Sequence, residues 1–303
     1  MNMTPARTLT ENEIAAYERD GVVCLRGIYS GEWVSALAEV LDEFYASEHH
    51  GAIPGLSKTF KEANYYWLQN DTVRDFVLYG PSARVAQQAM RSSKINFFYD
   101  QIFIKGAKTS DPTPWHHDMT FWPLAGNQIS TLWTSVDAVN AESSALEFVA
   151  GSHKWNKRWK PVAIGGVVVS EEKLEALPDI DADRSKYDIV SWSLEPGDAL
   201  LFNARTIHGA RGNSSAKTMR RAIATRWCGD DVVYQPVEGQ MPLPHKVGLQ
   251  PGEPLSGRMF PQILPSLDVD AVAERLKGPV SPDPEILAEV MERVSRAERV
   301  KVS

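Results

Sequence analysis

The sequence predicts a mainly β fold with flanking helices, arranged as a sandwich or barrel. Segments rich in aromatic and β-branched residues recur through the middle of the chain, and clusters of turn residues separate them. Helical hydrophobic patterns lie on both sides of this region. No glycine-rich phosphate loop and no regular strand–helix alternation interrupts it, so a doubly wound α/β fold is not favoured.

The composition is that of a folded globular chain with an acidic balance. The chain has 303 residues, 43% hydrophobic and 23% charged, and 32 Lys and Arg against 39 Asp and Glu give a net charge of −7. A chain of this length buries a large core, and β-barrels of this size often form one domain. An acidic chain lacks the general electrostatic footprint of a nucleic-acid binder. We therefore expect a single domain over residues 1–303 and no nucleic-acid partner.

Cysteine usage and hydropathy predict a cytoplasmic protein without a membrane partner. Cys24 and Cys228 are too few for a disulfide framework or a four-thiolate zinc site, although one bridge remains open. The N-terminus has no apolar stretch of the signal-peptide type. The most apolar run, 163–169, is too short to cross a bilayer.

Two helices and a strand are expected near the N-terminus. Thr10 to Glu13 read as a capping box, which predicts a helix over 13–20 that ends at Gly21. The apolar run 22–25 then predicts a short buried strand. A second helix is expected over about 31–46, because apolar side chains recur there at helical spacing. These are Val34, Leu37, Val40, Leu41 and Phe44.

The central strands are predicted at 94–105, 129–139, 145–149, 187–194, 199–202 and 220–227. The long charged stretch 155–186 between two of them is typical of a lid or a surface insertion. We therefore expect N-terminal helices over about 10–90, a β core over about 91–235 with a lid at about 155–186, and a helical tail over about 266–303.

The tail carries one more helical pattern. Pro284 marks a helix start, and an apolar stripe follows over 286–294. We expect this stripe to pack on the barrel of its own chain. A homodimer in which it packs on a second subunit is the alternative.

One histidine–aspartate triplet has the spacing of a metal site. On an extended segment residues i and i+2 point to the same side, so His116 and Asp118 can aim at one point while His117 faces away. Two imidazoles and one carboxylate form the facial ligand set that suits non-haem Fe(II). His208, which follows a predicted strand, is the best third ligand. Such triplets also arise by chance, and a surface loop carrying two histidines is the alternative interpretation.

A pair of arginines follows His208 on the next predicted strand. If 2-oxoglutarate accompanies the iron, its distal carboxylate needs a buried cation, and the planar guanidinium fork of Arg binds carboxylates in a bidentate manner. Arg220 and Arg221 point to opposite faces of a strand, so only one of them can face the interior. For an isolated pair, two surface charges on an edge strand are the alternative.

Taken together, these motifs resemble the phytanoyl-CoA dioxygenase (PhyH) family of Fe(II)/2-oxoglutarate-dependent oxygenases. The chain has WHHD at 115–118, TLWTSVDAV around Trp133, ALEFVAGSHKW at 145–155, LEPGDALLFNARTIHG at 194–209 and RRAI at 220–223. The resemblance covers roughly residues 10–265. It implies a double-stranded β-helix, which is a cupin-like jelly roll.

The resemblance also implies roles for single residues. His116, Asp118 and His208 correspond to the iron ligands, Arg220 to the residue that binds the C5 carboxylate of 2-oxoglutarate, and Trp133 to a wall of the cosubstrate pocket. Gln101 is expected at the other end of the cosubstrate. The chain departs from the family at Ala210, where members often have Ser. Thr131 and Thr218 are the two residues that we consider as replacements for its hydroxyl group.

The reaction implied is oxidation, most simply hydroxylation, of an unactivated C–H bond of a small molecule. Fe(II), 2-oxoglutarate and O2 are the expected cofactors, with ascorbate as the reductant in vitro. Related halogenases have a small residue in place of the carboxylate, so Asp118 favours hydroxylation, desaturation or rearrangement. Nearby aromatic residues favour a compact, partly hydrophobic substrate.

Two other functions remain open from the sequence. One is a metal-binding, cupin-like isomerase or hydrolase that uses zinc or manganese, which would keep the metal ligands without needing Arg220. The other is a ligand-binding jelly roll without catalytic activity.

Overall fold

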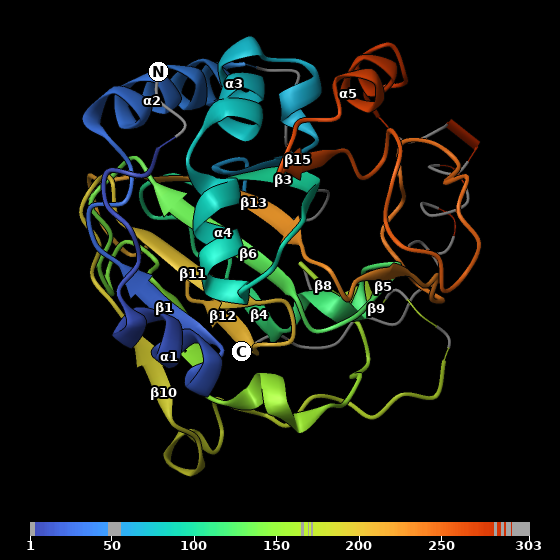
Figure 1. Ribbon diagram of the computed structural model, residues 1–303. Coiled ribbons are helices and arrows are strands. Elements are labelled where there is room, and N and C mark those ends of the chain that lie inside the picture. Colours follow the sequence, from blue (N-terminus) through green and yellow to red (C-terminus); the bar gives the residue numbers. More distant parts are fainter. Residues whose placement is uncertain are drawn as a thin grey trace.

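Two antiparallel sheets pack face to face, and helices cover the outer side of the larger one (Figure 1). This computed structural model describes residues 4–47, 56–164, 167, 168, 170, 172–281, 284, 285, 288 and 292. The larger sheet has the order β1 (Val22–Leu25), β11 (Ala199–Asn203), β6 (Ile129–Ser135), β13 (Arg220–Cys228), β3 (Ile95–Lys105) and β15 (Gln262–Leu264), and β2 (Phe60–Asn64) also pairs with β3. The fold is thus the jelly roll expected from the sequence.

The smaller sheet and two short ribbons complete the β structure. The smaller sheet has the order β10 (Ile189–Ser191), β7 (Leu146–Val149), β12 (His208–Ala210) and β4 (Thr113–His116). The two-stranded ribbons pair β14 (Val233–Tyr234) with β5 (Leu124–Ala125), and β8 (Val162–Ala163) with β9 (Val167–Val168).

The helices lie mainly over the outer face of the larger sheet, as Figure 1 shows for α4. They are α1 (Glu11–Asp20), α2 (Gly31–Ala46), α3 (Asp71–Tyr79), α4 (Ser82–Met90) and α5 (Val269–Leu276). Single 3-10 turns are η1 (Tyr66–Leu68), η2 (Asp118–Thr120), η3 (Ser152–Trp155) and η4 (Arg184–Lys186).

Strand alternation divides the core into two apolar layers. On β6, Leu132 packs in the layer under the helices, while its neighbour Trp133 packs in the layer between the sheets. On β13 the inner layer receives only Ala222 and Ala224. Because these side chains are small, they leave room between the sheets beside the functional residues.

The sequence predicted several of these elements closely. The Thr10 capping box is present, since the Thr10 side chain accepts a hydrogen bond from the backbone N–H of Glu13 and the Glu13 carboxylate accepts one from that of Thr10. The first strand and the helix over 31–46 have the predicted bounds. The strands predicted at 94–105, 145–149, 199–202 and 220–227 are each within one residue of β3, β7, β11 and β13 at either end.

Two predicted strands are shorter in the structure. The strand expected over 129–139 ends at Ser135, where the backbone N–H of Asp137 donates to the Ser135 hydroxyl and turns the chain. The strand expected over 187–194 is reduced to β10, which pairs only with β7. Val139 and Leu194 still meet in an isolated bridge.

Other elements were not predicted individually. They include β2, α3 and α4 within the range expected to be helical, and α5 within the tail. The described part of the lid range holds β8, β9, η4 and little other regular structure. The apolar stripe predicted at 286–294 lies almost wholly outside the described residues.

Both cysteines are free thiols: Cys24 is half-buried and Cys228 is buried. Each helix in the described ranges is too short or too polar to span a bilayer.

Gly21 connects the N-terminal helix to the interior of the fold. It ends α1 in the left-handed region with φ of 73°, and its carbonyl accepts a hydrogen bond from the Thr206 hydroxyl at 2.8 Å. A Cβ at this position would lie 2.3 Å from His153 Nδ1 and 2.5 Å from Thr206 Oγ1. Gly21 therefore meets both a conformational and a steric requirement.

We expect Gly21→Ala to lower the free energy of unfolding by about 1–3 kcal/mol through backbone strain, with a further loss from crowding. Gly27→Ala is the matched control, because Gly27 also has positive φ, of 58°, but no atom within 4 Å of a Cβ. Urea unfolding measures both. Equal losses in the two variants would show that the contacts with His153 and Thr206 do not matter.

Candidate metal centre and its cavity

Two histidines meet across neighbouring strands of the smaller sheet. In the antiparallel pairing of β12 with β4, His208 lies directly opposite His116. Their ring centroids are 4.3 Å apart. Directly opposed residues of an antiparallel pair have side chains on the same face, so both rings project into the space between the sheets.

Asp118 completes a three-residue group. One Asp118 carboxylate oxygen, Oδ1, lies 3.4 Å from His116 Nε2 and 3.9 Å from His208 Nε2. One ligand atom from each residue falls within 4.8 Å of the others. His117 between them is extended and buried, and neither of its ring nitrogens has a hydrogen-bond partner. The alternation expected from the sequence is thus present.

Hydrogen bonds hold the three side chains in place. His116 Nδ1 lies 2.7 Å from the carbonyl oxygen of Pro114, and His208 Nδ1 lies 2.9 Å from that of Thr206. A carbonyl oxygen can only accept, so Nδ1 carries the proton and Nε2 keeps its lone pair. The Thr131 hydroxyl donates to the other carboxylate oxygen of Asp118, Oδ2, at 3.3 Å.

The surroundings keep these groups in the protonation states that a metal needs. Burial, together with the neighbouring His116, lowers the pKa of His208 to about 4, so this imidazole is neutral at pH 7. Burial alone would raise the pKa of Asp118. Interaction with the His116 ring, together with His208 and Arg226, outweighs burial and holds the pKa of Asp118 well below its usual range.

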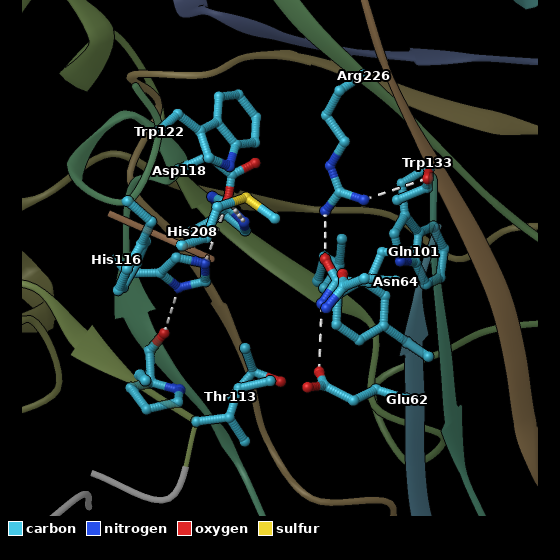
Figure 2. A pocket seen from close by; sticks show the side chains of 18 of the residues that line it. Glu62, Asn64, Gln101, Thr113, His116, Asp118, Trp122, Trp133, His208 and Arg226 are labelled. Carbon is cyan, nitrogen blue, oxygen red and sulfur yellow. Dashed lines mark hydrogen bonds and ion pairs between the residues drawn. The ribbon is translucent and has the colours of Figure 1, made fainter. Parts of the chain in front are cut away.

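A cavity of about 280 Å³ opens beside the three residues (Figure 2). Its walls come from β2, β3, β4, β6, β7, β11, β12 and β13, and from the described part of the lid. Apolar and aromatic side chains dominate the lining, including Phe103, Phe121, Trp122, Ile164 and Met241. The polar lining residues that matter below are Glu62, Gln101, Thr113, Arg220 and Arg226.

Arg220 and Arg221 point in opposite directions, as expected for neighbours on a strand. Arg220 is buried, lines the cavity and lies over the Trp133 ring at 5.4 Å. Its Nε has no hydrogen-bond partner, and within the described ranges its guanidinium forms no ion pair. Arg221 instead binds Asp137 and Asp42 on the outside, each at 2.6 Å. The inner arginine is the one suited to an anionic ligand.

A second cation and a hydroxyl group lie near Arg220. Lys105 is directly opposite Arg220 in the β13–β3 pairing, is fully buried, and donates to the carbonyl of Arg211 at 2.9 Å. Burial and then the charge of Arg220 lower the pKa of Lys105 well below its usual range. Thr113 is paired with Ala210 and brings a hydroxyl side chain to the cavity wall.

The two hydroxyl groups considered as replacements for the missing serine have other partners. Thr131 donates to Asp118, and Thr218 donates to Ser215 Oγ. Neither appears in the cavity wall with Arg220, whereas Thr113 does.

Gln101 and Trp133 both line the cavity, but Gln101 is already engaged. Its amide oxygen accepts from Arg226 at 2.7 Å, and its amide nitrogen donates to Glu62 at 3.2 Å. Figure 2 shows this chain of hydrogen bonds on the side of the cavity opposite the histidines.

Arg226 and Glu62 line the cavity but were not predicted from the sequence as site residues. Arg226 lines the cavity like Arg220, six residues further along β13, so strand alternation could have identified it from the sequence. Glu62 lies on β2, a strand within a range expected to be helical.

The remaining candidate aromatic residues and histidines lie partly in the cavity wall and partly elsewhere in the fold. Phe121 and Trp122 line the cavity, while Trp227 is in the helix-side core and Trp115 donates to Asp181 outside the cavity. His153 packs at Gly21, and His245 bonds the carbonyl of Lys246, so neither joins the metal group. His49 and His50 lie outside the described residues.

The donor set fits non-haem iron with an anionic cosubstrate. Two imidazoles and one ionised carboxylate converge from one side, and the cavity lies on the other side. This facial set leaves coordination positions open. The buried, unpaired guanidinium of Arg220 in the same cavity suits the distal carboxylate of 2-oxoglutarate.

Comparisons with known proteins identify a family. The sequence model described as "Phytanoyl-CoA dioxygenase (PhyH)" matches residues 17–222. Peroxisomal phytanoyl-CoA dioxygenase of Rattus norvegicus is 28% identical over 141 residues, which cover 44% of this chain and only 38% of that enzyme. The multifunctional dioxygenase prhA of Penicillium brasilianum is 23% identical over 254 residues, covering 73% of this chain and 72% of that one.

A solved structure supports the fold. The epimerase SnoN of nogalamycin biosynthesis, in complex with Fe3+, alpha ketoglutarate and nogalamycin RO, superposes with a TM-score of 0.65 at 23% identity. The superposition covers 84% of this chain and 98% of that one.

We expect Asp118→Ala and His208→Ala to lose Fe(II) affinity by more than the roughly 10- to 100-fold that an outer-shell change costs, because each removes a direct ligand. Anaerobic calorimetric titration with Fe(II) measures the affinity. His117→Leu is the control, because His117 is buried next to the ligands but turned away from them. Retained affinity in both alanine variants would place the metal elsewhere.

Proposed function

Because this chain belongs to the phytanoyl-CoA dioxygenase family, we propose that it is an Fe(II)- and 2-oxoglutarate-dependent oxygenase acting on a small organic molecule. One observation carries the proposal: the three possible metal ligands and the unpaired, buried Arg220 line the same cavity. A cupin-like enzyme with non-oxidative chemistry would use the metal ligands but would have no need for that arginine.

In this proposal His116, Asp118 and His208 hold the iron, and Arg220 holds the C5 carboxylate of 2-oxoglutarate. Bound there, the metal and cosubstrate would supply O2 activation, with 2-oxoglutarate converted to succinate and CO2 and an unactivated C–H bond of the substrate oxidised. The carboxylate at Asp118 supports hydroxylation, desaturation or rearrangement over halogenation. Thr113 is placed to supply the hydroxyl group that Ala210 lacks.

The chain's own residues orient and protect the reaction site. The carbonyls of Pro114 and Thr206 fix the tautomers of the two histidines, and Thr131 occupies Oδ2 of Asp118, which leaves Oδ1 directed at the metal position. The Arg220 guanidinium lies over the Trp133 ring at 5.4 Å, a cation–π contact that favours its position at the wall. Phe121 and Trp122 exclude water from the side of the histidines.

The shape of the cavity supports a compact, partly hydrophobic substrate. Met241 and the lid residues Val162 to Ile164 border it together with aromatic side chains. A pocket of about 280 Å³ is small for one that must hold both a cosubstrate and a substrate. The part of the substrate that reacts must therefore be compact.

We expect the purified protein, given Fe(II), 2-oxoglutarate and ascorbate, to form succinate slowly in the presence of O2, and candidate substrates that couple to turnover to accelerate it. Asp118→Ala and His208→Ala should form none, because each lacks an iron ligand, while His117→Leu should retain turnover. Succinate is quantified by mass spectrometry. Full turnover by both alanine variants, or no consumption of 2-oxoglutarate by the wild type, would refute the proposed reaction.

We expect Arg220→Ala to raise the apparent KM for 2-oxoglutarate about 30- to 1000-fold, which corresponds to about 2–4 kcal/mol for one buried bidentate contact. Arg221→Ala serves as the control, because Arg221 is bound to Asp137 and Asp42 outside the cavity. Initial rates of succinate formation at varied 2-oxoglutarate give both values. An unchanged KM in the Arg220 variant would remove this residue from the cosubstrate site.

A further inference from the structure

An acidic side chain without a cationic partner lines the cavity opposite the metal ligands. β2 extends the larger sheet beyond β3, with Glu62 opposite Phe103 and Asn64 opposite Gln101. Since paired residues share a face, these side chains project inward like Gln101. Glu62 therefore belongs to the cavity wall, as Figure 2 shows.

The carboxylate is held in a fixed position. Arg226 donates to the amide oxygen of Gln101 at 2.7 Å, and this fixes the amide so that its nitrogen donates to Glu62 Oε2 at 3.2 Å. Arg226 is itself buried and lies over the Tyr99 ring at 4.4 Å. Gln101 and Arg226, the other two members of this chain of hydrogen bonds, thus have few alternative positions.

This contact leaves Glu62 with unused acceptor capacity. An ionised carboxylate has about four acceptor positions, and the one hydrogen bond found for Glu62 uses only one of them. In the described part of the protein no Lys, Arg or His lies within ion-pair distance of it, and Arg226 acts on it only through Gln101 and at longer range.

The Glu62 side chain is half-buried at the cavity wall, and this position has an energetic consequence. Burial raises the pKa of Glu62 to about 7, although the hydrogen bond from Gln101 and the charge of Arg226 both oppose the rise. A desolvated carboxylate gains more from a cationic donor than a hydrated one does, because the neighbouring wall is apolar. A ligand that brings a positive charge would restore the interactions that burial removes.

The cavity thus separates two unpaired charges of opposite sign. Arg220 offers positive charge to an anion, while Glu62 offers negative charge on another part of the wall. The proposed function assigns Arg220 to 2-oxoglutarate. An anionic substrate group would be repelled by Glu62, whereas a cationic group would be attracted to it.

We propose that Glu62, oriented by Gln101 and Arg226, is the recognition point for the primary substrate, and that this substrate is a compact, largely apolar molecule carrying a protonated amine. That this molecule is the substrate rests on the proposed function, but its binding to Glu62 requires no iron. Gln101 is then a positioning residue for substrate recognition, in place of the cosubstrate contact expected from the sequence.

The test compares three probes of equal ring size in the metal-free full-length protein: cyclohexylammonium, cyclohexanol and cyclohexanecarboxylate. Calorimetric titration at pH 8 should show the ammonium binding about 10- to 100-fold more tightly than the alcohol, because of one charge-assisted hydrogen bond. The carboxylate is expected to bind only through Arg220 of the same cavity, so its binding should be lost in Arg220→Ala. Equal binding of ammonium and alcohol would overturn the proposal.

Two variants and a pH series identify the residue responsible. Glu62→Gln keeps the shape and should abolish the preference for ammonium, while Glu39→Gln, on the exposed side of α2, should leave it unchanged. Thermal unfolding checks that both variants are folded. Binding of the ammonium to the wild type should strengthen between pH 6 and 8, as Glu62 loses its proton near pH 7, and should be flat in Glu62→Gln. A preference that survives in Glu62→Gln would assign recognition to another group.

The outcome can be separated from that of the proposed reaction. Succinate formation by the wild type without any preference for ammonium would leave the oxygenase intact and overturn only the role of Glu62. Selective ammonium binding without succinate formation would support the site and refute the reaction.

Discussion

The antiparallel pairing of β4 with β12 is the constraint on which the rest of the site depends. It places His116 directly opposite His208, although the two are far apart in the chain. A slip of one residue would turn one imidazole to the other face of the sheet. Backbone carbonyls two residues before each histidine, those of Pro114 and Thr206, fix the ring tautomers. Pairing, orientation and protonation of the two histidines therefore have a single structural origin.

The charges of the cavity follow from the inner face of the larger sheet. The strand register places Arg220 beside Lys105, and it places Gln101 beside Asn64. The basic part of the wall and the part that carries Glu62 are therefore separate positions on one surface. Ala222 and Ala224 lie between them on β13 and leave the volume that ligands would need. Burial lowers the pKa of Arg220 to about 10 and raises the pKa of Glu62 to about 7, so it favours the neutral form of each side chain. An incoming ligand of opposite charge would relieve both costs.

The sequence could predict what depends on local pattern. The capping box at Thr10, the alternation that separates His116 and Asp118 from His117, and the opposite directions of Arg220 and Arg221 are properties of a few adjacent residues, and the structure has all of them. It could not predict what depends on pairing between distant strands. The strand β2 is short and has the composition FKEAN, which has no strong strand pattern, and only its register with β3 brings Glu62 to the cavity. The hydrogen bond from Arg226 to Gln101 could not be predicted either, because it also depends on the pairing of distant strands.

The central claim is that one metal ion is held by two imidazoles and one carboxylate on one side only. X-ray absorption spectroscopy of the anaerobic Fe(II)-loaded protein tests it most directly. We expect a six-coordinate iron with two imidazole nitrogens, and the exchange of two water ligands for oxygen atoms of 2-oxoglutarate when it is added. A four-coordinate site, a single imidazole, or a spectrum unchanged by 2-oxoglutarate would contradict it.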